Sequence, residues 1–319
     1  MSDPGNFGPM PVPQNTLYGR RWSVVVANDS SALDLSELHI TFSIEQQDVE
    51  TPNNATIRIY NLSDATTVRL LSKEYSRVVV SAGYKNGPYG VIFDGTIKQS
   101  KRGRLDQTLT YLDILAADGD EAYNFGVISQ SLAAGATVKD QIDAVASGLG
   151  VDIGSLPEFA NLGDPEIIRG KVLFGLAKDR ARQIALSNNA RWSLQNNKFV
   201  MIANDAYITA DPIVLTSNTG LIGLPEQTQD GIKVTTLLNP KLIIGKPVKI
   251  DNKSIQAALF DVAYGALNFF PTISYDGLYR IVISEFAGDT RGNDWYSYLT
   301  CFSIDPAVPA AQSVNPWPT

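Results

Sequence analysis

The sequence predicts a mainly β protein in which two β-barrel-like parts flank a small α+β insert. Apolar and polar residues alternate in short runs, as in Ile232 and Val234 against Lys233 and Thr235. Turn signals such as Asn86-Gly87-Pro88 separate these runs at short spacing. Helical spacing of apolar residues is concentrated between residues 130 and 205. Together these patterns place strands at both ends of the chain and helices in the middle.

Composition limits both the size and the class of the protein. The chain has 319 residues and 44% hydrophobic content, enough for two or three domains. No apolar run is long enough to span a membrane, and MSDPGNFGPMPVP lacks the basic and apolar regions of a signal peptide. A net charge of −7 argues against a protein that reads nucleic-acid sequence, because phosphate contacts supply most of that affinity. Such a charge suits a surface past which DNA slides without binding.

The first part of the chain predicts an N-terminal arm (residues 1–17) and a first β domain (residues 18–128). The arm holds four prolines and has no periodic pattern. A short helix over Ser63–Leu71 begins with Ser63 as its N-cap. Six strands are expected, at Trp22–Ala27, Leu38–Ile44, Ala55–Leu62, Arg77–Tyr84, Tyr89–Gln99 and Gln107–Ala116. Short strands with such turns indicate a small barrel or a sandwich.

Residues 129–216 predict the α+β insert. A helix begins after Thr137, which forms a capping-box-like start with Asp140, and ends at Gly150. A second helix is expected from about Leu173 to Ser187, burying Leu173, Leu176, Ala177, Ile184 and also Ala181. A hairpin follows over Trp192–Ile202. If Asn196-Asn197 is its two-residue turn, Leu194 faces Phe199 and Trp192 faces Met201, so that all four lie on one side.

Residues 217–304 predict a second β-barrel, and residues 305–319 a C-terminal tail. Strands are expected at Gly231–Leu238, Lys246–Asp251, Gly277–Phe286 and Trp295–Ile304. The stretch Asp251–Phe270 fits either a helix or a long loop. Two β domains of similar size suggest a duplication, although no strict sequence repeat is visible. In the tail, Trp317 with Pro306, Pro309 and Pro316 forms a candidate partner-docking segment.

The residue types that enzymes need are scarce in this chain. The one histidine, His39, lies in an alternating run without a nucleophile elbow, and one His with one Cys does not make a zinc site. Cys301 fits a buried thiol in a strand. The carboxylates Asp113, Asp118, Asp120 and Glu121 lack EF-hand spacing, and a turn that ends a strand explains most of them. No catalytic, cofactor or metal residue is therefore predicted.

Several segments resemble the baseplate hub (tail-tip hub) proteins of contractile-tailed bacteriophages. The resemblance spans about residues 20–255 and follows the order and spacing of its segments. They are Asn53–Ser63 (NNATIRIYNLS), Ala82–Gln99, Tyr111–Phe125, Ser131–Ile142, Arg191–Ile202 and Gly223–Ile250. The resemblance implies two β-barrel tube domains around an inserted domain, and no catalytic residue is carried over from it.

The resemblance also implies partners and a location. Hubs of this kind form a homotrimeric ring that adapts the hexameric tail tube, or a tube initiator, to the trimeric central spike. Tape measure protein and DNA pass through the lumen without sequence-specific binding. The protein would be a virion component assembled in the host cytoplasm, without membrane insertion.

Other functions remain open from the residues alone. One is another tail part with the same barrel, such as a tube initiator or the hub of a contractile injection system. A second is a carbohydrate-binding β module, for which Tyr84, Tyr89, Trp295, Tyr296 and Tyr298 would supply an aromatic face. A third is a glycosidase that uses two carboxylates. The basic cluster Lys98–Arg104 fits a solvated hairpin tip or a contact with DNA or a partner.

Overall fold

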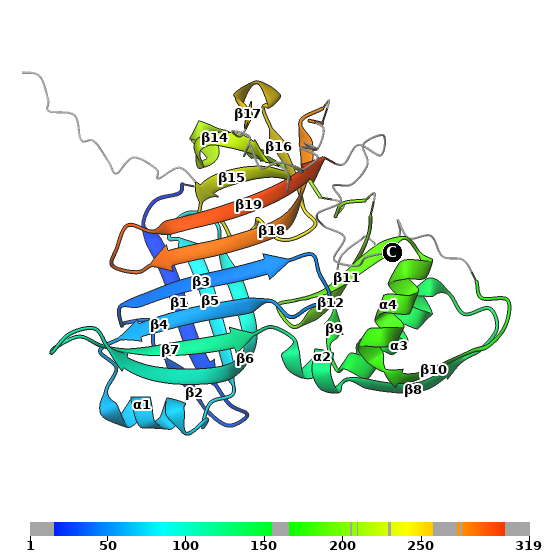
Figure 1. Ribbon diagram of the computed structural model, residues 1–319, viewed down its shortest axis with the longest axis horizontal. Coiled ribbons are helices and arrows are strands. Elements are labelled where there is room, and N and C mark those ends of the chain that lie inside the picture. The colour runs from blue at the N-terminus through cyan, green and yellow to red at the C-terminus, as the bar shows by residue number, and fades with distance from the viewer. Residues whose placement is uncertain are drawn as a thin grey trace, which may run out of the picture.

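The computed structural model describes residues 16–154, 166–204, 206–208, 210–228, 231–257, 273–274 and 276–303. Strand is the main secondary structure in this part of the chain (Figure 1). The first strands are β1 (Arg20–Ala27), β2 (Ala32–Asp34), β3 (Ile40–Gln47), β4 (Asn54–Tyr60), β5 (Arg77–Tyr84), β6 (Tyr89–Arg104) and β7 (Thr110–Ala117). The last are β13 (Ile213–Leu215), β14 (Leu221–Thr228), β15 (Gly231–Leu237), β16 (Pro247–Ile250), β17 (Gln256–Ala257), β18 (Leu278–Asp289) and β19 (Trp295–Ser303). Three short helices join them, α1 (Asp64–Leu71), η2 (Ser217–Thr219) and η3 (Asn252–Ser254).

All of these strands belong to one mostly antiparallel sheet. Its order is β17-β14-β15-β19-β18-β3-β4-β7-β6-β5-β1-β2, with β16 pairing β18 and β13 pairing β16. The sheet bends, so that β1 and β5 lie behind β3 and β4 in Figure 1. Strands from the two ends of the sequence meet where β18 pairs with β3, from Ile283↔Gln47 to Asp289↔Thr41.

The β18–β3 pairing explains why the two expected barrels are not found. A strand has only two edges, and β3 uses one for β4 and the other for β18. It therefore has no edge left with which to close against β1. No strand ladder closes within the described residues. The mainly β class is right, but the two parts share one open sheet.

The two halves of this sheet repeat the same order of strand pairing. In the first half the neighbours are β3-β4-β7-β6-β5-β1, and in the second they are β14-β15-β19-β18-β16-β13. Equivalent strands also follow each other in the same chain order. The outermost pairs differ, since β1 and β5 are antiparallel and β13 and β16 are parallel. The repeat therefore exists in topology although no repeat is visible in the sequence.

The equivalent strands β6 and β18 carry equivalent bulges. The β6–β7 register shifts between Ile97 and Gln99, and the β18–β19 register shifts between Ile281 and Ile283. In each strand the bulge falls where the partner on the opposite edge ends. β5 pairs with β6 up to Thr96, and β16 pairs with β18 up to Arg280. Beyond its bulge, β18 takes β3 as the new partner on that edge.

The insert packs three helices against two small sheets. Its helices are α2 (Asp120–Phe125), α3 (Val138–Leu149) and α4 (Ala177–Ser187). Its strands are β8 (Val127–Leu132), β9 (Asp152–Ile153), β10 (Lys171–Leu176), β11 (Ala190–Gln195) and β12 (Lys198–Ala203). Thr137 and Asp140 form the predicted capping box, and Gly150 ends α3 in the left-handed conformation. Trp192 pairs with Met201 and Leu194 with Phe199, as predicted, and all four side chains are buried.

One predicted helix begins too early. Residues 171–176 form β10, paired with β8, and α4 starts only at Ala177. Leu173 is buried as expected, but Leu176 is 38% exposed because it lies on the outer side of β10. Gly175, with φ of +114°, occupies a backbone conformation that a helix does not contain. The predictions also omitted the helix α2 and the strands β2, β8, β9, β13, β14 and β17.

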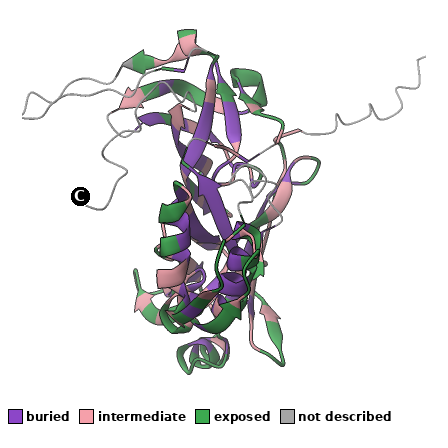
Figure 2. Ribbon diagram, turned by 90° about the vertical axis from the view of Figure 1, so that its right-hand side faces the viewer, coloured by how far each residue is buried: buried purple, intermediate pink, exposed green. Residues whose placement is uncertain are grey.

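The buried apolar side chains form three main clusters, seen as the purple interior in Figure 2. One lies in the fold of the first half-sheet, one in the insert and one in the second half-sheet. The first cluster also contains Phe286 and Trp295 from β18 and β19. The two half-sheets are therefore joined by side-chain packing as well as by the β18–β3 hydrogen bonds.

Candidate assembly surfaces

The residues singled out for chemistry have structural partners. His39 Nε2 lies 2.8 Å from Asp289 Oδ1, and its ring stacks on Tyr60 with centroids 4.3 Å apart. Cys301 is fully buried in β19, and burial raises the pKa of its thiol. Both side chains hold the sheet together. A thiol in this state is a poor nucleophile.

The four carboxylates of interest are also dispersed. Asp113 forms a two-point ion pair with Arg58, whose Nε lies 2.6 Å from Asp113 Oδ1. Asp120 pairs with Lys98 and accepts from Asn124, whereas Glu121 is exposed. Within the described part of the chain, no three His, Cys, Asp or Glu residues are grouped as a metal site would need. No described helix is long and apolar enough to cross a membrane.

Asp118 ties the insert to the sheet. Its carboxylate accepts hydrogen bonds from the backbone N–H of Asn196 at 2.5 Å and of Asn197 at 2.7 Å. Both asparagines have positive φ, +51° and +59°, as a type I′ hairpin turn requires. Burial raises the pKa of Asp118 to about 6, although the two N–H donors act in the opposite direction. The residue that follows β7 is therefore hydrogen-bonded to the turn of the β11–β12 hairpin.

Further contacts fix the same joint. The Asn53 side chain donates to the carbonyl of Leu194 at 2.9 Å, and Gln195 Nε2 donates to the carbonyl of Gln47 at 2.8 Å. Arg182 on α4 pairs with Glu50 at 2.7 Å. Arg280 on β18 donates to main-chain carbonyls at the end of β12, including that of Ala203 at 3.1 Å. The insert thus has polar contacts with both half-sheets.

Two strand edges within this sheet are available for pairing. On the β5 side of β6, no described strand pairs with Gln99–Arg104. On the outer side of β14, only β17 pairs, at Glu226 and Gln227. In the topological repeat, β6 is equivalent to β18 and β14 to β3. These two edges are therefore the counterparts of the edges that join within the chain.

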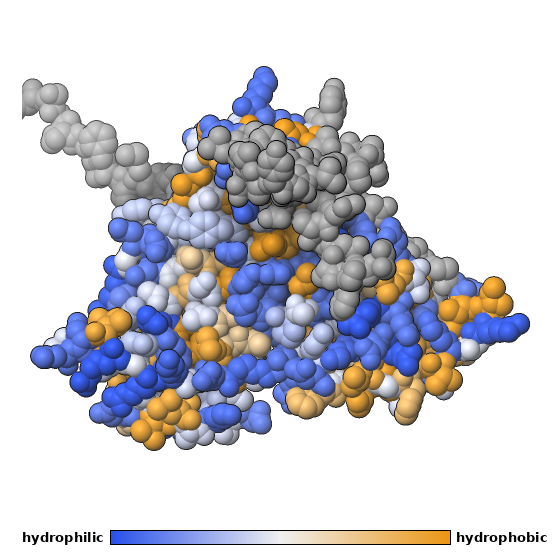
Figure 3. Space-filling model, viewed as in Figure 1, coloured by the Kyte–Doolittle hydropathy of each residue, from blue (hydrophilic) through white to orange (hydrophobic). Residues whose placement is uncertain are grey.

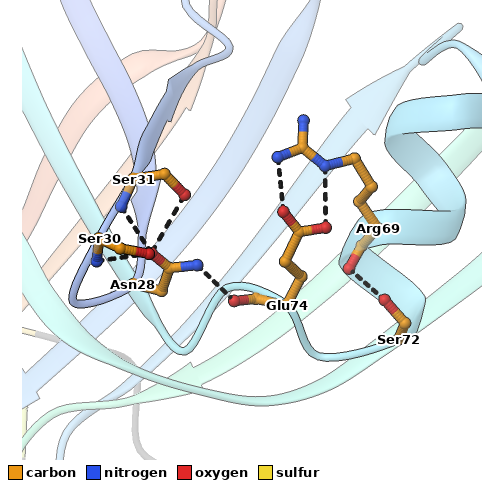
Figure 4. Close-up of polar contacts among 6 residues, drawn as sticks. All are labelled: Asn28, Ser30, Ser31, Arg69, Ser72 and Glu74. Atoms are coloured by element: carbon orange, nitrogen blue, oxygen red, sulfur yellow. Dashed lines mark hydrogen bonds and ion pairs between the residues drawn. The ribbon is translucent and has the colours of Figure 1, made fainter.

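The β2 end of the sheet is different because it is short and held by a turn. β2 has three residues. Asn28 Oδ1 accepts from the backbone N–H of Ser30 at 2.9 Å and of Ser31 at 2.7 Å, and Asn28 Nδ2 donates to the Glu74 carbonyl (Figure 4). Glu74 in turn pairs with Arg69 of α1 at 2.6 Å. Short, anchored edge strands of this kind resist pairing with other chains.

One face of the sheet is polar over both halves. A row of side chains crosses four strands through the pairs Tyr298↔Glu285, Glu285↔Glu45 and Glu45↔Asn54. A second row passes through Ser43 and Thr56 to Leu115. Seen from the side of Figure 3, hydrophilic and intermediate residues alternate with scattered hydrophobic ones over these strands. We call this the polar face.

The insert exposes an apolar face on β8 and β10. Val127 lies opposite Leu176, and Phe174 and Val172 lie opposite Ser129 and Ser131, so all project to one side. Phe174 is 66% exposed and Val172 and Val127 are similarly open. The hydrophobic residues at the lower right of Figure 3 fall in this region. An exposed apolar patch on a folded domain is typical of an interaction surface.

The aromatic set proposed for carbohydrate binding does not form an exposed platform. Tyr84 and Trp295 are buried, whereas Tyr298 is exposed on the polar face. A pocket of about 390 Å³ lies beside the buried pair, where the starts of β1 and β19 meet the ends of β5 and β15. Trp317, Pro306, Pro309 and Pro316 lie outside the described residues, as do the arm residues 1–15 and most of residues 258–276.

The strand edges and the apolar face could not be identified as sites from the sequence. Both consist of ordinary strand residues, and only the pairing of distant strands shows which edges are left over. The exposure of Lys101, Arg102 and Arg104 agrees with a solvated tip, but these residues also border the open edge of β6.

Comparison with known proteins identifies the family. A family model described as baseplate hub gp41 matches residues 22–259. The fold is similar to the 43 kDa tail protein of prophage MuSo2 from Shewanella oneidensis, with a TM-score of 0.54, 8% identity and coverage of 92% of this chain and 100% of that chain. It is also similar to a tail protein from Neisseria meningitidis MC58, with a TM-score of 0.54, 10% identity and coverage of 89% and 96%. No curated protein sequence matches the chain. Because the family match covers most of the chain, the protein belongs to the baseplate hub gp41 family and is a structural component of a phage tail baseplate.

Proposed function

We propose that three copies of this chain form a ring, the hub of a contractile tail baseplate, and that the ring works without catalysis. The observation that carries the proposal is the repeated strand-pairing order, with its two halves joined through β18 and β3. On this view the first half (within residues 18–128) and the second half (within residues 217–304) are two tube domains, and residues 129–216 are the inserted domain.

The junction inside the chain supplies a template for the junction between chains. β18, beyond its bulge, pairs with β3 of the other half. The equivalent step pairs β6, beyond its bulge, with β14 of the next copy. β6 has an available edge on Gln99–Arg104, and the register places this edge against the Glu226–Thr228 end of β14, where it would replace the two-residue strand β17. Open strand edges favour pairing with another chain, and a head-to-tail contact closes into a ring when its rotation permits.

Three chains with two units each place six similar units around one axis. Such a ring matches a hexameric tail tube, or a tube initiator, on one side and a trimeric central spike on the other. The polar face would line the channel. Short polar side chains such as Ser43 and Thr56 suit the passage of tape measure protein and DNA. The adjacent carboxylates of Glu45 and Glu285 would repel phosphate groups and so prevent sequence-specific binding of DNA.

The remaining surfaces would contact other baseplate parts. The apolar face of β8 and β10 lies on the insert, away from the proposed ring junction, and would face a neighbouring protein of the virion. Assembly in the host cytoplasm, followed by incorporation into the tail, agrees with the single buried cysteine.

The experiment is a mass measurement with imaging. The purified chain, alone and co-expressed with the neighbouring spike candidate, is analysed by light scattering and by electron microscopy. We expect a mass of three chains and end-on views with a central channel and six lobes. A stable monomer in both preparations, or a ring of six chains, would contradict the trimeric hub.

A further inference from the structure

The pocket beside Trp295 has features that the proposed ring does not use. Its wall includes Leu17 and Tyr18 just before β1, Arg20 at the start of β1, Tyr84 at the end of β5, and Trp295 and Tyr296 at the start of β19. Three of these side chains are tyrosines and one is a tryptophan. Tyr18 is 84% exposed, which leaves most of one aromatic ring uncovered at the pocket rim.

Two buried polar groups in the pocket wall have no hydrogen-bond partner. Tyr84 is 3% exposed and Trp295 is 2% exposed, yet neither the Tyr84 hydroxyl nor Trp295 Nε1 has a partner in the described structure. Burial raises the pKa of Tyr84 to about 12, while the charge of Arg20 lowers it and Tyr296 raises it. Buried Tyr and Trp normally find partners, so the pair indicates a missing acceptor.

The chemistry of this wall fits a proline-rich extended peptide. Aromatic rings pack against proline rings, and a polyproline II segment leaves its carbonyls free to accept hydrogen bonds. Tyr84 and Trp295 are the kind of donors that such carbonyls use. The Arg20 guanidinium is already held by main-chain carbonyls, including that of Gly292 at 2.6 Å, so it serves as a fixed part of the wall.

The chain itself carries such a peptide just before the residues that line the pocket. The sequence Pro9-Met10-Pro11-Val12-Pro13 lies just before the first described residues. Thr16 donates its N–H to the Asn86 carbonyl, and Gly87 permits this approach, because a Cβ there would lie 2.4 Å from the Thr16 oxygen. The next residue, Leu17, lines the pocket. Tethering at this distance gives the arm a high effective concentration, on the order of millimolar.

We propose that the pocket is a docking site for residues 9–13 of the chain's own N-terminal arm. The arm turns back at residues 14–16, its prolines cover Tyr18, and its carbonyls accept from the Tyr84 hydroxyl and from Trp295 Nε1. This site does not depend on the ring. The C-terminal segment Pro316-Trp317-Pro318 is the competing occupant. It follows β19, whose far end lies about 26 Å from Trp295 at 3.3 Å per residue, so it would have to run back along the strand to reach the pocket.

Disulfide trapping in the full-length chain tests the proposal. The native Cys301 is buried and unreactive, so introduced cysteines report cleanly. Val12→Cys is combined with Asn293→Cys, since Asn293 is exposed and lines the pocket. We expect an intramolecular disulfide under mild oxidation, identified by peptide mass spectrometry. Replacing Pro9, Pro11 and Pro13 by Ser should slow formation of the disulfide by about fivefold or more. The serine variant of the arm would be flexible and would have no preformed extended shape.

A matched control separates docking from mere proximity. Val12→Cys with Lys85→Cys places the second thiol beside the exit of the arm but outside the pocket lining, because Lys85 is exposed and its N–H bonds to Gly19. Docking makes the Asn293 variant react faster than this control and makes it sensitive to Tyr84→Phe. Equal rates at the two positions overturn the proposal. So do a product of twice the chain mass, which assigns the arm to a neighbour, and trapping of Asn293→Cys by Trp317→Cys, which assigns the pocket to the C-terminal segment.

Discussion

Asp118 joins the end of β7 to the turn of the β11–β12 hairpin, and its buried carboxyl makes this joint sensitive to pH. Its folded-state pKa of about 6 lies above the ordinary value of 3.8. The folded state therefore holds the proton more tightly than the unfolded chain, so this group's contribution to stability is present below pH 4 and is lost as pH rises through 6. A shift of this size corresponds to roughly 3 kcal/mol. Asp118→Asn removes the titration. Between pH 4.5 and 7, the unfolding free energy of the wild type should therefore fall by about 2 kcal/mol more than that of the variant, measured by urea denaturation.

The alternative outcome at this residue is equally informative. The N–H groups of Asn196 and Asn197 stabilise the carboxylate and oppose the effect of burial. Equal pH slopes for wild type and Asp118→Asn would mean that these two donors outweigh desolvation and that Asp118 is ionised throughout. The sequence marked Asp118 only as part of an acidic turn, because its partners lie 78 and 79 residues away in the chain.

At the scale of elements, successive residues of β10 point to opposite sides, one into the core of the insert and the other to the exposed apolar face. Leu173 is 1% exposed and packs under α4, whereas Phe174 is 66% exposed on the apolar face. Phe174→Ser should change stability by no more than about 0.5 kcal/mol and reduce self-association and binding of a hydrophobic dye. The matched variant Leu173→Ser should cost about 3 kcal/mol or more, because it creates a cavity and buries a hydroxyl. Thermal unfolding with light scattering measures both, and equal destabilisation would mean that Phe174 is packed.

Several elements show what the local sequence pattern can and cannot predict. The β11–β12 hairpin was predictable because its turn, Asn196-Asn197, sets the register and its apolar residues fall on one side. The N-cap at Ser63 and the capping box at Thr137 were predictable for the same local reason. β10 was not, because Leu173, Leu176 and Ala177 also fit helical spacing, and only its pairing with β8 makes it a strand. The apolar face was missed for the same reason.

At the scale of the whole molecule, the topology could not be predicted from local pattern. Sequence alternation gave most strands, but the β18–β3 pairing joins residues about 240 positions apart, as in Phe286↔Ile44. Because of that pairing, the chain forms one open sheet instead of the two expected barrels. The same pairing also identifies which strand edges of the two halves are equivalent. The proposed docking residues Trp317, Pro306, Pro309 and Pro316 remain a prediction.

The equivalence of β6 with β18 and of β14 with β3 makes a sharp prediction about assembly. Lys101 is the counterpart of Glu285 and Thr228 is the counterpart of Glu45, which face each other across the β18–β3 junction, so Lys101 and Thr228 should face each other between copies. A chain carrying Lys101→Cys and Thr228→Cys should form disulfides between copies on oxidation, and these should end at a covalent trimer on a non-reducing gel. The trimer is the end point because three head-to-tail contacts close the ring and use every introduced thiol.

Thr56→Cys with Thr228→Cys is the matched control, since β4 has partners on both edges and should give no trimer. A ladder that continues beyond three chains would mean an open contact that does not close, and the absence of any linked species would show that β6 and β14 do not meet.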